Sequence, residues 1–239
     1  MNTHLLRAGI YVSVICMAIA CGAPYINAQD NLFGNYMQRT GDYADIYNGR
    51  IETNYNILQY ENLPYYNSSD FTEASIIYRK NFYPDQKVRL DLYREQLITL
   101  PPDKQYGVIV RNSDVDKVFM YNKIFKWMVP SEESGLKPGY YIHMTEGKKM
   151  QLFCKENYSK QQQLLTYSFD RRVRYYLLYN NRYHTVKNKG SFSKLFPRYK
   201  KQINQFAKEH QLNFSRDKDK SLIALVDYCE ELLTSTNTQ

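Results

Sequence analysis

Alternation of apolar and polar residues dominates the middle of the chain. In residues 87–93, Val88, Leu90 and Leu92 alternate with charged or tyrosine side chains, which is the period-two pattern of a strand with one buried face. Similar runs predict further strands at residues 75–79, 96–100, 107–111, 115–121, 123–129, 139–145, 149–155, 164–169, 173–179 and 182–186. Turn residues separate them at positions 83–85, 101–103, 137–139, 146–147 and 180–181. Many short strands without intervening helices indicate an antiparallel sheet or a sandwich.

After Gly190 the apolar spacing changes to three or four residues, which marks one face of a helix. A first helix is expected to begin at Ser193 as N-cap, with Pro197 in its first turn. A second helix is expected over residues 220–233, capped by Asp219. The fold class is therefore mainly β, an antiparallel sheet or sandwich closed by two C-terminal α-helices. Helices of this length are marginal in water, so we expect them to pack on the β-domain.

The first 28 residues have the three zones of a secretory signal. Arg7 supplies the positive charge, and residues 8–20 form an apolar run that is too short to span a bilayer, which needs about 20 residues. Cleavage is expected after Ala28. A competing route lipidates Cys21, which would tether the protein to a membrane, and an uncleaved anchor is the third alternative.

The rest of the chain divides by composition. Residues 29–73 are polar and show little clear period, so we expect an irregular N-terminal segment with short ordered pieces at most. A β-rich domain is expected over residues 74–190, followed by the helical pair over residues 191–234 and a polar tail over residues 235–239.

Positive charge is concentrated in one part of the chain. Residues 148–220 contain 18 Lys and Arg against 5 Asp and Glu, a difference of +13, whereas residues 29–147 contain 13 against 16. Aromatic residues interleave with this basic block, but export argues against nucleic acid as the partner. One interpretation is a solvated basic face. The other is a surface for anionic lipid, lipopolysaccharide or another envelope protein, formed by Arg171, Arg172, Arg174, Lys200 and Lys201.

Patterned stretches in both halves of the chain carry a resemblance to known proteins. They are residues 74–78, 88–93, 96–100 and 115–119 in the first half, and residues 139–141, 175–177 and the Lys-Gly-Ser-Phe run at 189–192 in the second. Over roughly residues 74–233 the chain resembles an uncharacterised group of secreted Bacteroidetes proteins. The resemblance implies a bacterial origin and an envelope location, and it brings no catalytic residues.

Signatures of common enzyme classes are missing from the sequence. His143, His184 and His210 have no partner at metal-ligand spacing, and the chain has neither a G-x-S-x-G motif nor a glycine-rich phosphate loop. We therefore expect no metal, no cofactor and no catalytic residue. Cys154 and Cys229 remain after export. An oxidising compartment permits a disulfide between them, and two buried free thiols are the alternative.

These features predict a non-enzymatic binding protein of the cell envelope, periplasmic or associated with the outer membrane. A tyrosine-rich chain suits strands with one wet face and also surfaces that bind sugars or peptides. The alternative is a secreted hydrolase. Its catalytic pair would be Cys154 with a histidine, or two carboxylates from among Asp91, Asp103, Asp114 and Asp116.

Overall fold

The computed structural model describes residues 44–102 and 105–235, so the predicted signal, Cys21, Ala28 and most of the predicted tail lie outside the described residues. The strands are β1 (Arg50–Ile51), β2 (Thr72–Tyr78), β3 (Asn81–Asp91), β4 (Gln96–Thr99), β5 (Val108–Ile109), β6 (Val115–Met120), β7 (Lys123–Met128), β8 (Gly139–His143), β9 (Met150–Gln162), β10 (Tyr167–Tyr179) and β11 (Arg182–Val186). The helices are α2 (Lys189–Leu195), α3 (Lys200–Glu209) and α4 (Lys218–Ser235), with short 3₁₀ turns η2 (Asp45–Tyr47), η3 (Asn112–Asp114), η4 (Glu132–Ser134) and η5 (Pro197–Tyr199).

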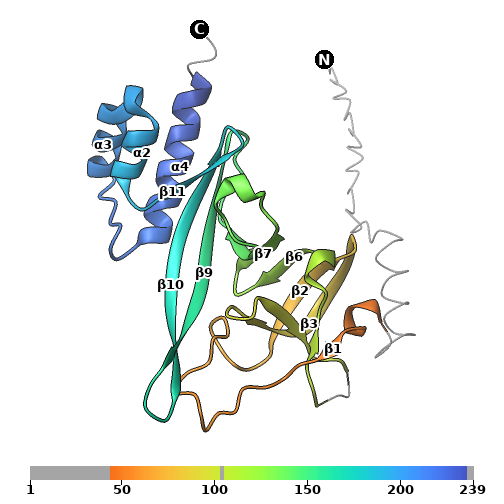
Figure 1. The fold of residues 1–239 in the computed structure, drawn as a ribbon. Coiled ribbons are helices and arrows are strands. Elements are labelled where there is room, and N and C mark those ends of the chain that lie inside the picture. Colours follow the sequence, from red (N-terminus) through yellow and green to blue (C-terminus); the bar gives the residue numbers. More distant parts are fainter. Residues whose placement is uncertain (1–43, 103–104, 236–239) are drawn as a thin grey trace, which may run out of the picture.

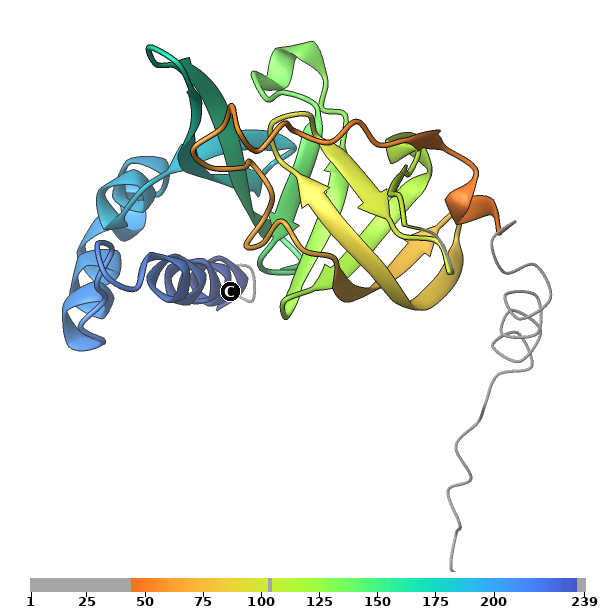
Figure 2. The same cartoon turned by 90° about the horizontal axis from the view of Figure 1, so that it is seen from below.

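The strands form one antiparallel sheet of 11 strands in the order β1-β5-β4-β3-β2-β6-β7-β8-β9-β10-β11. The predicted mainly β fold with C-terminal helices is therefore confirmed, in the form of a single open sheet. The sheet is strongly curved (Figure 2). The hairpin of β9 and β10 extends from it as a long ribbon, and the helices gather at the opposite end of the molecule from the tip of this hairpin (Figure 1).

Two-residue turns join several neighbouring strands. Asn180 and Asn181 between β10 and β11 have φ values of 49° and 58°, and the pairs at residues 79–80 and 121–122 also have two positive φ values. Such turns match the right-handed twist of the strands that they connect, and asparagine tolerates this backbone well. The predicted turn at residues 180–181 therefore lies where its residue types indicate.

The predicted turn at residues 83–85 is wrong, because these residues lie inside β3. The register between β2 and β3 shifts between Ala74 and Ile76, and Asp85 has a φ of 52°. The proline and the aspartate thus form a β-bulge that bends the strand without ending it. The separate strands predicted at residues 164–169 and 173–179 are also corrected. Residues 167–179 form one strand, paired with β9 from Tyr167 opposite Gln162 to Tyr179 opposite Met150.

The first predicted helix is divided in two, which corrects its start. Asn188 is the N-cap of α2 and accepts a hydrogen bond from Gly190 N at 3.0 Å, whereas Ser193 is buried inside the helix. Pro197 lies after the end of α2, because proline has no N–H to continue the helical hydrogen bonds. Helix α4 begins at Lys218, so Asp219 lies in its first turn.

A continuous apolar core joins the sheet to the helices. Phe192, Ile203, Leu222 and Leu225 are all fully buried in the same cluster as the inward side chains of the strands. Polar contacts add to this packing. The hydroxyl of Tyr175 on β10 donates to Asp219 Oδ1 at 2.6 Å, and Glu230 on α4 accepts from the backbone N–H groups of residues 149 and 150 at 2.7 and 3.1 Å.

Residues 52–71, which we call the strap, run from β1 to the far end of the β9–β10 hairpin and back to β2 (Figure 1). Polar contacts with β3 attach the strap to the sheet. Tyr55 Oη donates to the buried Asp91 Oδ2 at 2.8 Å. Arg89 Nη2 on β3 lies 2.5 Å from Glu52 Oε2 on the strap, and Tyr65 Oη, also on the strap, donates to Glu52 Oε1 at 2.9 Å. The strap therefore covers Asp91, on the face of β3 that the sequence pattern assigned to polar side chains.

Candidate functional site

A cavity of about 440 Å³ lies against the middle of the β9–β10 hairpin. One side is formed by the two strands of the hairpin. The others are formed by the turn between β3 and β4, the loop before β8, and Tyr141 on β8. Among the described residues, one acidic residue, Glu95, lines the cavity. Four basic residues line it as well: Lys137, Lys155, Arg172 and Arg174. We call this cavity the hairpin pocket.

The two arginines face the pocket because they alternate along β10. Residues two apart on a strand lie on the same face, about 6.5–7 Å apart. Arg172 is opposite Asn157 and Arg174 is opposite Lys155 on β9, and all four residues line the pocket. Both arginines are exposed. Within the described part of the chain, neither guanidinium has a salt bridge or a hydrogen bond to a side chain, so both are available to a ligand.

A buried ion pair lies beside these arginines. Lys155 Nζ lies 2.5 Å from Glu95 Oε1 and donates to Tyr140 O at 3.0 Å, while Tyr140 N donates to Glu95 Oε2 at 2.8 Å. The side chains of Lys155 and Glu95 are 8% and 20% exposed. Burial lowers the pKa of Lys155 and raises the pKa of Glu95, because leaving water disfavours the charged form of each group.

Gly139 at the start of β8 leaves room for this pair. A Cβ atom at this position would overlap both Lys155 Nζ and the Glu95 carboxylate, and its φ of 155° is one that other residues rarely adopt. The predicted turn at residues 137–139 therefore supplies the space in which the pair forms.

Tyrosine rings supply the apolar part of the pocket wall. Tyr93, Tyr141, Tyr158 and Tyr176 all line it. Tyr141 and Tyr176 meet edge to face with ring centroids 6.2 Å apart, and Lys155 Nζ lies 4.9 Å from the centroid of the Tyr141 ring. Tyr141 Oη donates to Lys137 O at 2.7 Å, and burial raises the pKa of this hydroxyl further above neutrality. Tyr141 therefore stays neutral beside the cations.

The structure does not bring the five predicted basic residues together. Arg171 faces the other side of β10, where its Nε lies 2.7 Å from Glu156 Oε2. Lys200 and Lys201 lie on α3, and Lys200 lines a different cavity of about 670 Å³ beside α2. Arg172 and Arg174 are thus the two predicted residues that share the hairpin pocket.

Lys155, Glu95 and the four tyrosines were not predicted as site residues. Pairing of β9 with β10 aligns Lys155 with Arg174, and sequence alone does not fix that register. The spacing of Arg172 and Arg174 was the one available signal, because it places both on one face of a strand.

The two cysteines are free and buried, Cys154 on β9 and Cys229 on α4. Burial raises the pKa of each thiol to about 12, which is opposite to what a nucleophilic cysteine requires. His143 stacks on Phe153, whose neighbour Cys154 points to the opposite face of β9. The proposed pairing of Cys154 with this histidine therefore has no geometric support.

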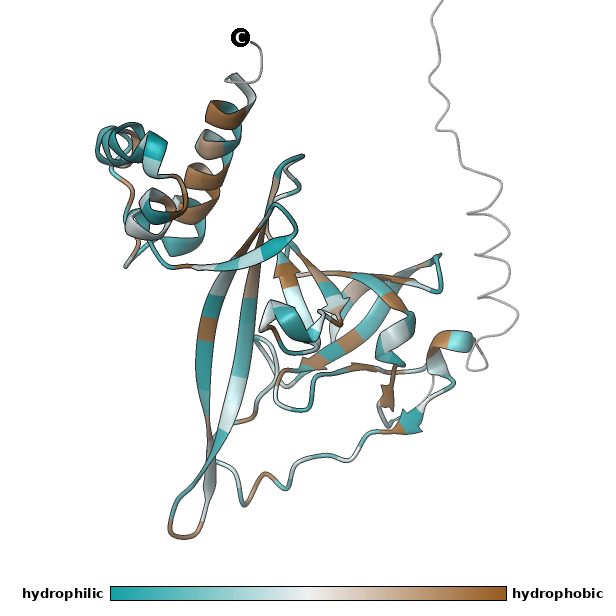
Figure 3. Ribbon diagram, turned by 45° about the horizontal axis from the view of Figure 1, so that its top comes forward, coloured by the Kyte–Doolittle hydropathy of each residue, from teal (hydrophilic) through white to brown (hydrophobic). Residues whose placement is uncertain are grey.

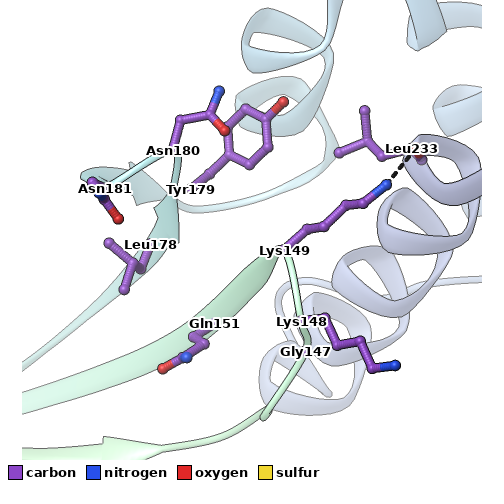
Figure 4. Close-up of a pocket in the computed structure, with 9 residues that line it drawn as sticks. All are labelled: Gly147, Lys148, Lys149, Gln151, Leu178, Tyr179, Asn180, Asn181 and Leu233. Carbon is purple, nitrogen blue, oxygen red and sulfur yellow. Dashed lines mark hydrogen bonds between the residues drawn. The ribbon is translucent and has the colours of Figure 1, made fainter. Parts of the chain in front are cut away.

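A second cavity of about 550 Å³ lies between the β8–β9 loop, the β10–β11 turn and the end of α4 (Figure 4). Its lining includes Lys148, Gln151, Asn180 and Asn181. Lys149 reaches across it and donates to Leu233 O at 2.7 Å, as the dashed line in Figure 4 marks. This lysine satisfies a carbonyl at the C-terminal end of α4, so its contact has a structural purpose.

Among residues 44–102 and 105–235, no three His, Cys, Asp or Glu side chains gather as a metal site. No helix in these ranges is both long enough and apolar enough to cross a membrane. Comparison of the chain with family models, with curated proteins and with solved structures found no match.

Proposed function

We propose that this protein is an exported, non-enzymatic binding protein that holds an anionic group of another envelope component in the hairpin pocket. The observation that carries the proposal is the pair of arginines, Arg172 and Arg174, that share one wall of this cavity without an acidic partner among the described residues.

The chemistry of the pocket indicates a carboxylate or a phosphate on an organic ring. A guanidinium presents its N–H groups as a planar fork that matches either anion with two parallel hydrogen bonds. Four basic residues against one acidic residue favour a negative ligand, and the tyrosine rings offer flat apolar surface to the body that carries it. A volume of about 440 Å³ suits a group the size of a lipid headgroup or a monosaccharide.

The alternative of a secreted hydrolase has less support. The Glu95 carboxylate is engaged by Lys155 Nζ and by Tyr140 N, and Cys154 lies in the apolar core. Asp114 is also engaged, because Arg79 Nε lies 2.7 Å from its Oδ2. A general acid or a nucleophile needs a free position facing the substrate.

The proposal of export rests on the N-terminal sequence and on the resemblance to secreted Bacteroidetes proteins. Cleavage after Ala28 gives a released protein, whereas lipidation of Cys21 gives a tethered one. The intact mass of the exported form distinguishes these outcomes. We expect a chain that starts at Gln29 without lipid, and a lipidated chain that starts at Cys21 would contradict this.

Calorimetric titration tests binding in the pocket, with inorganic phosphate and glucuronate as anionic probes and glucose as the neutral probe. We expect an anionic probe to bind, and glucose to bind more weakly. The Arg172→Gln/Arg174→Gln variant should weaken anion binding at least about tenfold, because two charge-assisted hydrogen-bond partners are lost.

The matched control is Lys200→Gln/Lys201→Gln, which removes the same charge from α3 and leaves the pocket intact. Equal losses in the two variants would show a diffuse effect of net charge. That result, or the failure of both anions to bind the wild-type protein, would contradict the proposal.

A further inference from the structure

Apolar side chains are exposed on two neighbouring loops at the end of the molecule opposite the helices. Leu164 and Leu165 at the tip of the β9–β10 hairpin are 100% and 91% exposed, and Ile57 and Leu58 on the strap are 72% and 86% exposed. Figure 3 shows both loops as hydrophobic stretches at the same end of the molecule. We call these four residues the apolar tip.

Hydrogen bonds hold the two loops side by side. Tyr167 N donates to Gln59 O at 2.8 Å, and Glu61 N donates to Tyr167 O at 2.9 Å. Thr166 Oγ1 adds a bond of 2.7 Å to Glu61 Oε1. The backbone at the base of the loops is thus well bonded, while the apolar side chains beyond it remain exposed.

The backbone conformation of the hairpin turn does not explain why leucine occupies positions 164 and 165. Gln163 N donates to Thr166 O at 2.8 Å, so Leu164 and Leu165 are the two central residues of the connection. Neither leucine is among the residues with a positive φ, so the turn tolerates leucine at these positions but does not require it. Two fully exposed leucines also gain nothing from burial in this chain. They therefore point to a function outside the folded domain.

Tyrosines and a lysine form a band directly behind the apolar tip. Tyr60 and Tyr167 meet with ring centroids 5.4 Å apart, and Lys160 Nζ lies 3.6 Å from the centroid of Tyr167 and donates to Tyr60 Oη at 3.0 Å. Apolar side chains at the end, aromatic rings behind them and a cation at the same level match the layers of a bilayer surface. Tyrosine is enriched at that interface, and lysine binds anionic headgroups there.

We infer that the apolar tip inserts into the surface of a lipid bilayer that contains anionic headgroups. The tip protrudes, so it suits a fluid phase that closes around it better than a preformed protein groove. Lys160, directly behind the tip, supplies a positive charge that favours an anionic surface. Insertion at this end would direct the helices away from the membrane (Figure 1). This surface is separate from the hairpin pocket, and its test does not depend on ligand binding there.

Co-sedimentation with vesicles tests the inference, using phosphatidylcholine alone and phosphatidylcholine mixed with phosphatidylglycerol. The wild-type protein should bind the mixed vesicles and keep part of this binding at high salt, because apolar insertion is not screened. Leu164→Asp/Leu165→Asp should lower the partition coefficient at least about tenfold. The control Val129→Asp adds one negative charge at an apolar residue that is 70% exposed on another loop, and it should bind nearly as the wild type does.

A Leu165→Trp variant reports the depth of insertion. Its added fluorescence should be quenched by vesicles with brominated acyl chains, whereas the native Trp127, which packs against the core, should not be quenched. Failure of the wild-type protein to bind either vesicle would overturn the inference, as would unchanged binding by the double aspartate variant. A dimer that this variant abolishes, measured by sedimentation velocity in the absence of lipid, would assign the tip to a second copy of the chain and would also overturn it.

Discussion

Replacement of Lys155 by methionine should destabilise the protein far more than replacement of a surface lysine. Methionine keeps the apolar length of the side chain but removes the ammonium that lies 2.5 Å from Glu95 Oε1. Removal of one partner of a buried ion pair costs about 3–5 kcal/mol, because the other charge stays buried without compensation. Glu95 keeps its bond from Tyr140 N and is 20% exposed, so we expect a loss near about 3 kcal/mol.

Urea unfolding at neutral pH measures this loss, with Lys148→Met as the control. Lys148 is exposed, and its replacement should change the free energy of unfolding by less than about 0.5 kcal/mol. In the double variant Lys155→Met/Glu95→Gln the buried charge is gone, so much of the lost stability should return.

The pH dependence of the stability of Lys155→Met is a second test of the Lys155–Glu95 pair. Burial already raises the pKa of Glu95, and loss of Lys155 raises it further. A raised carboxyl pKa means that the folded state binds the proton more tightly, so the penalty of Lys155→Met should shrink as the pH falls through the pKa of folded Glu95. An unchanged unfolding midpoint in Lys155→Met, or a double variant as unstable as the single one, would refute the reasoning.

Further predictions concern the core and the pH response. Leu225→Ala should cost about 2–5 kcal/mol, and sheet and helix signals should melt together, because Leu225 is fully buried in the core that sheet and helices share; separate transitions would contradict this. Gly139→Ala should lower the melting temperature, since its Cβ would overlap Lys155 and Glu95; an unchanged melt would count against it. Burial lowers the pKa of His143, so stability should fall as the pH drops below about 6.5, and less so in His143→Gln; equal slopes would exclude this role.

Alternation of apolar and polar residues predicted the strands well where one face of the strand is buried. Val88, Leu90 and Leu92 are all buried as their alternation indicates. The same reasoning failed at Pro84 and Asp85, because a bulge uses the same residue types as a turn. It also divided β10 at its exposed part, where no buried face imposes a pattern on residues 170–172.

The site was less predictable, because its parts come from distant segments. Glu95 and Lys155 are 60 positions apart, and only the folded sheet joins them. The basic block was interpreted as one face, although strand alternation already separates Arg171 from Arg172 and Arg174. The sequence therefore shows which segment carries the positive charge, but the direction of each side chain decides which basic residues share a site.

The central claim is that Arg172 and Arg174 bind an anionic group, and NMR of arginine side chains tests it most directly. In a titration with glucuronate or phosphate, the Nε–Hε signals of Arg172 and Arg174 should shift together and saturate at the same ligand concentration. The signal of Arg171 should stay in place, because its Nε already donates to Glu156 Oε2 at 2.7 Å. Saturable shifts at other arginines with none at Arg172 and Arg174 would contradict the account, as would the absence of any saturable shift.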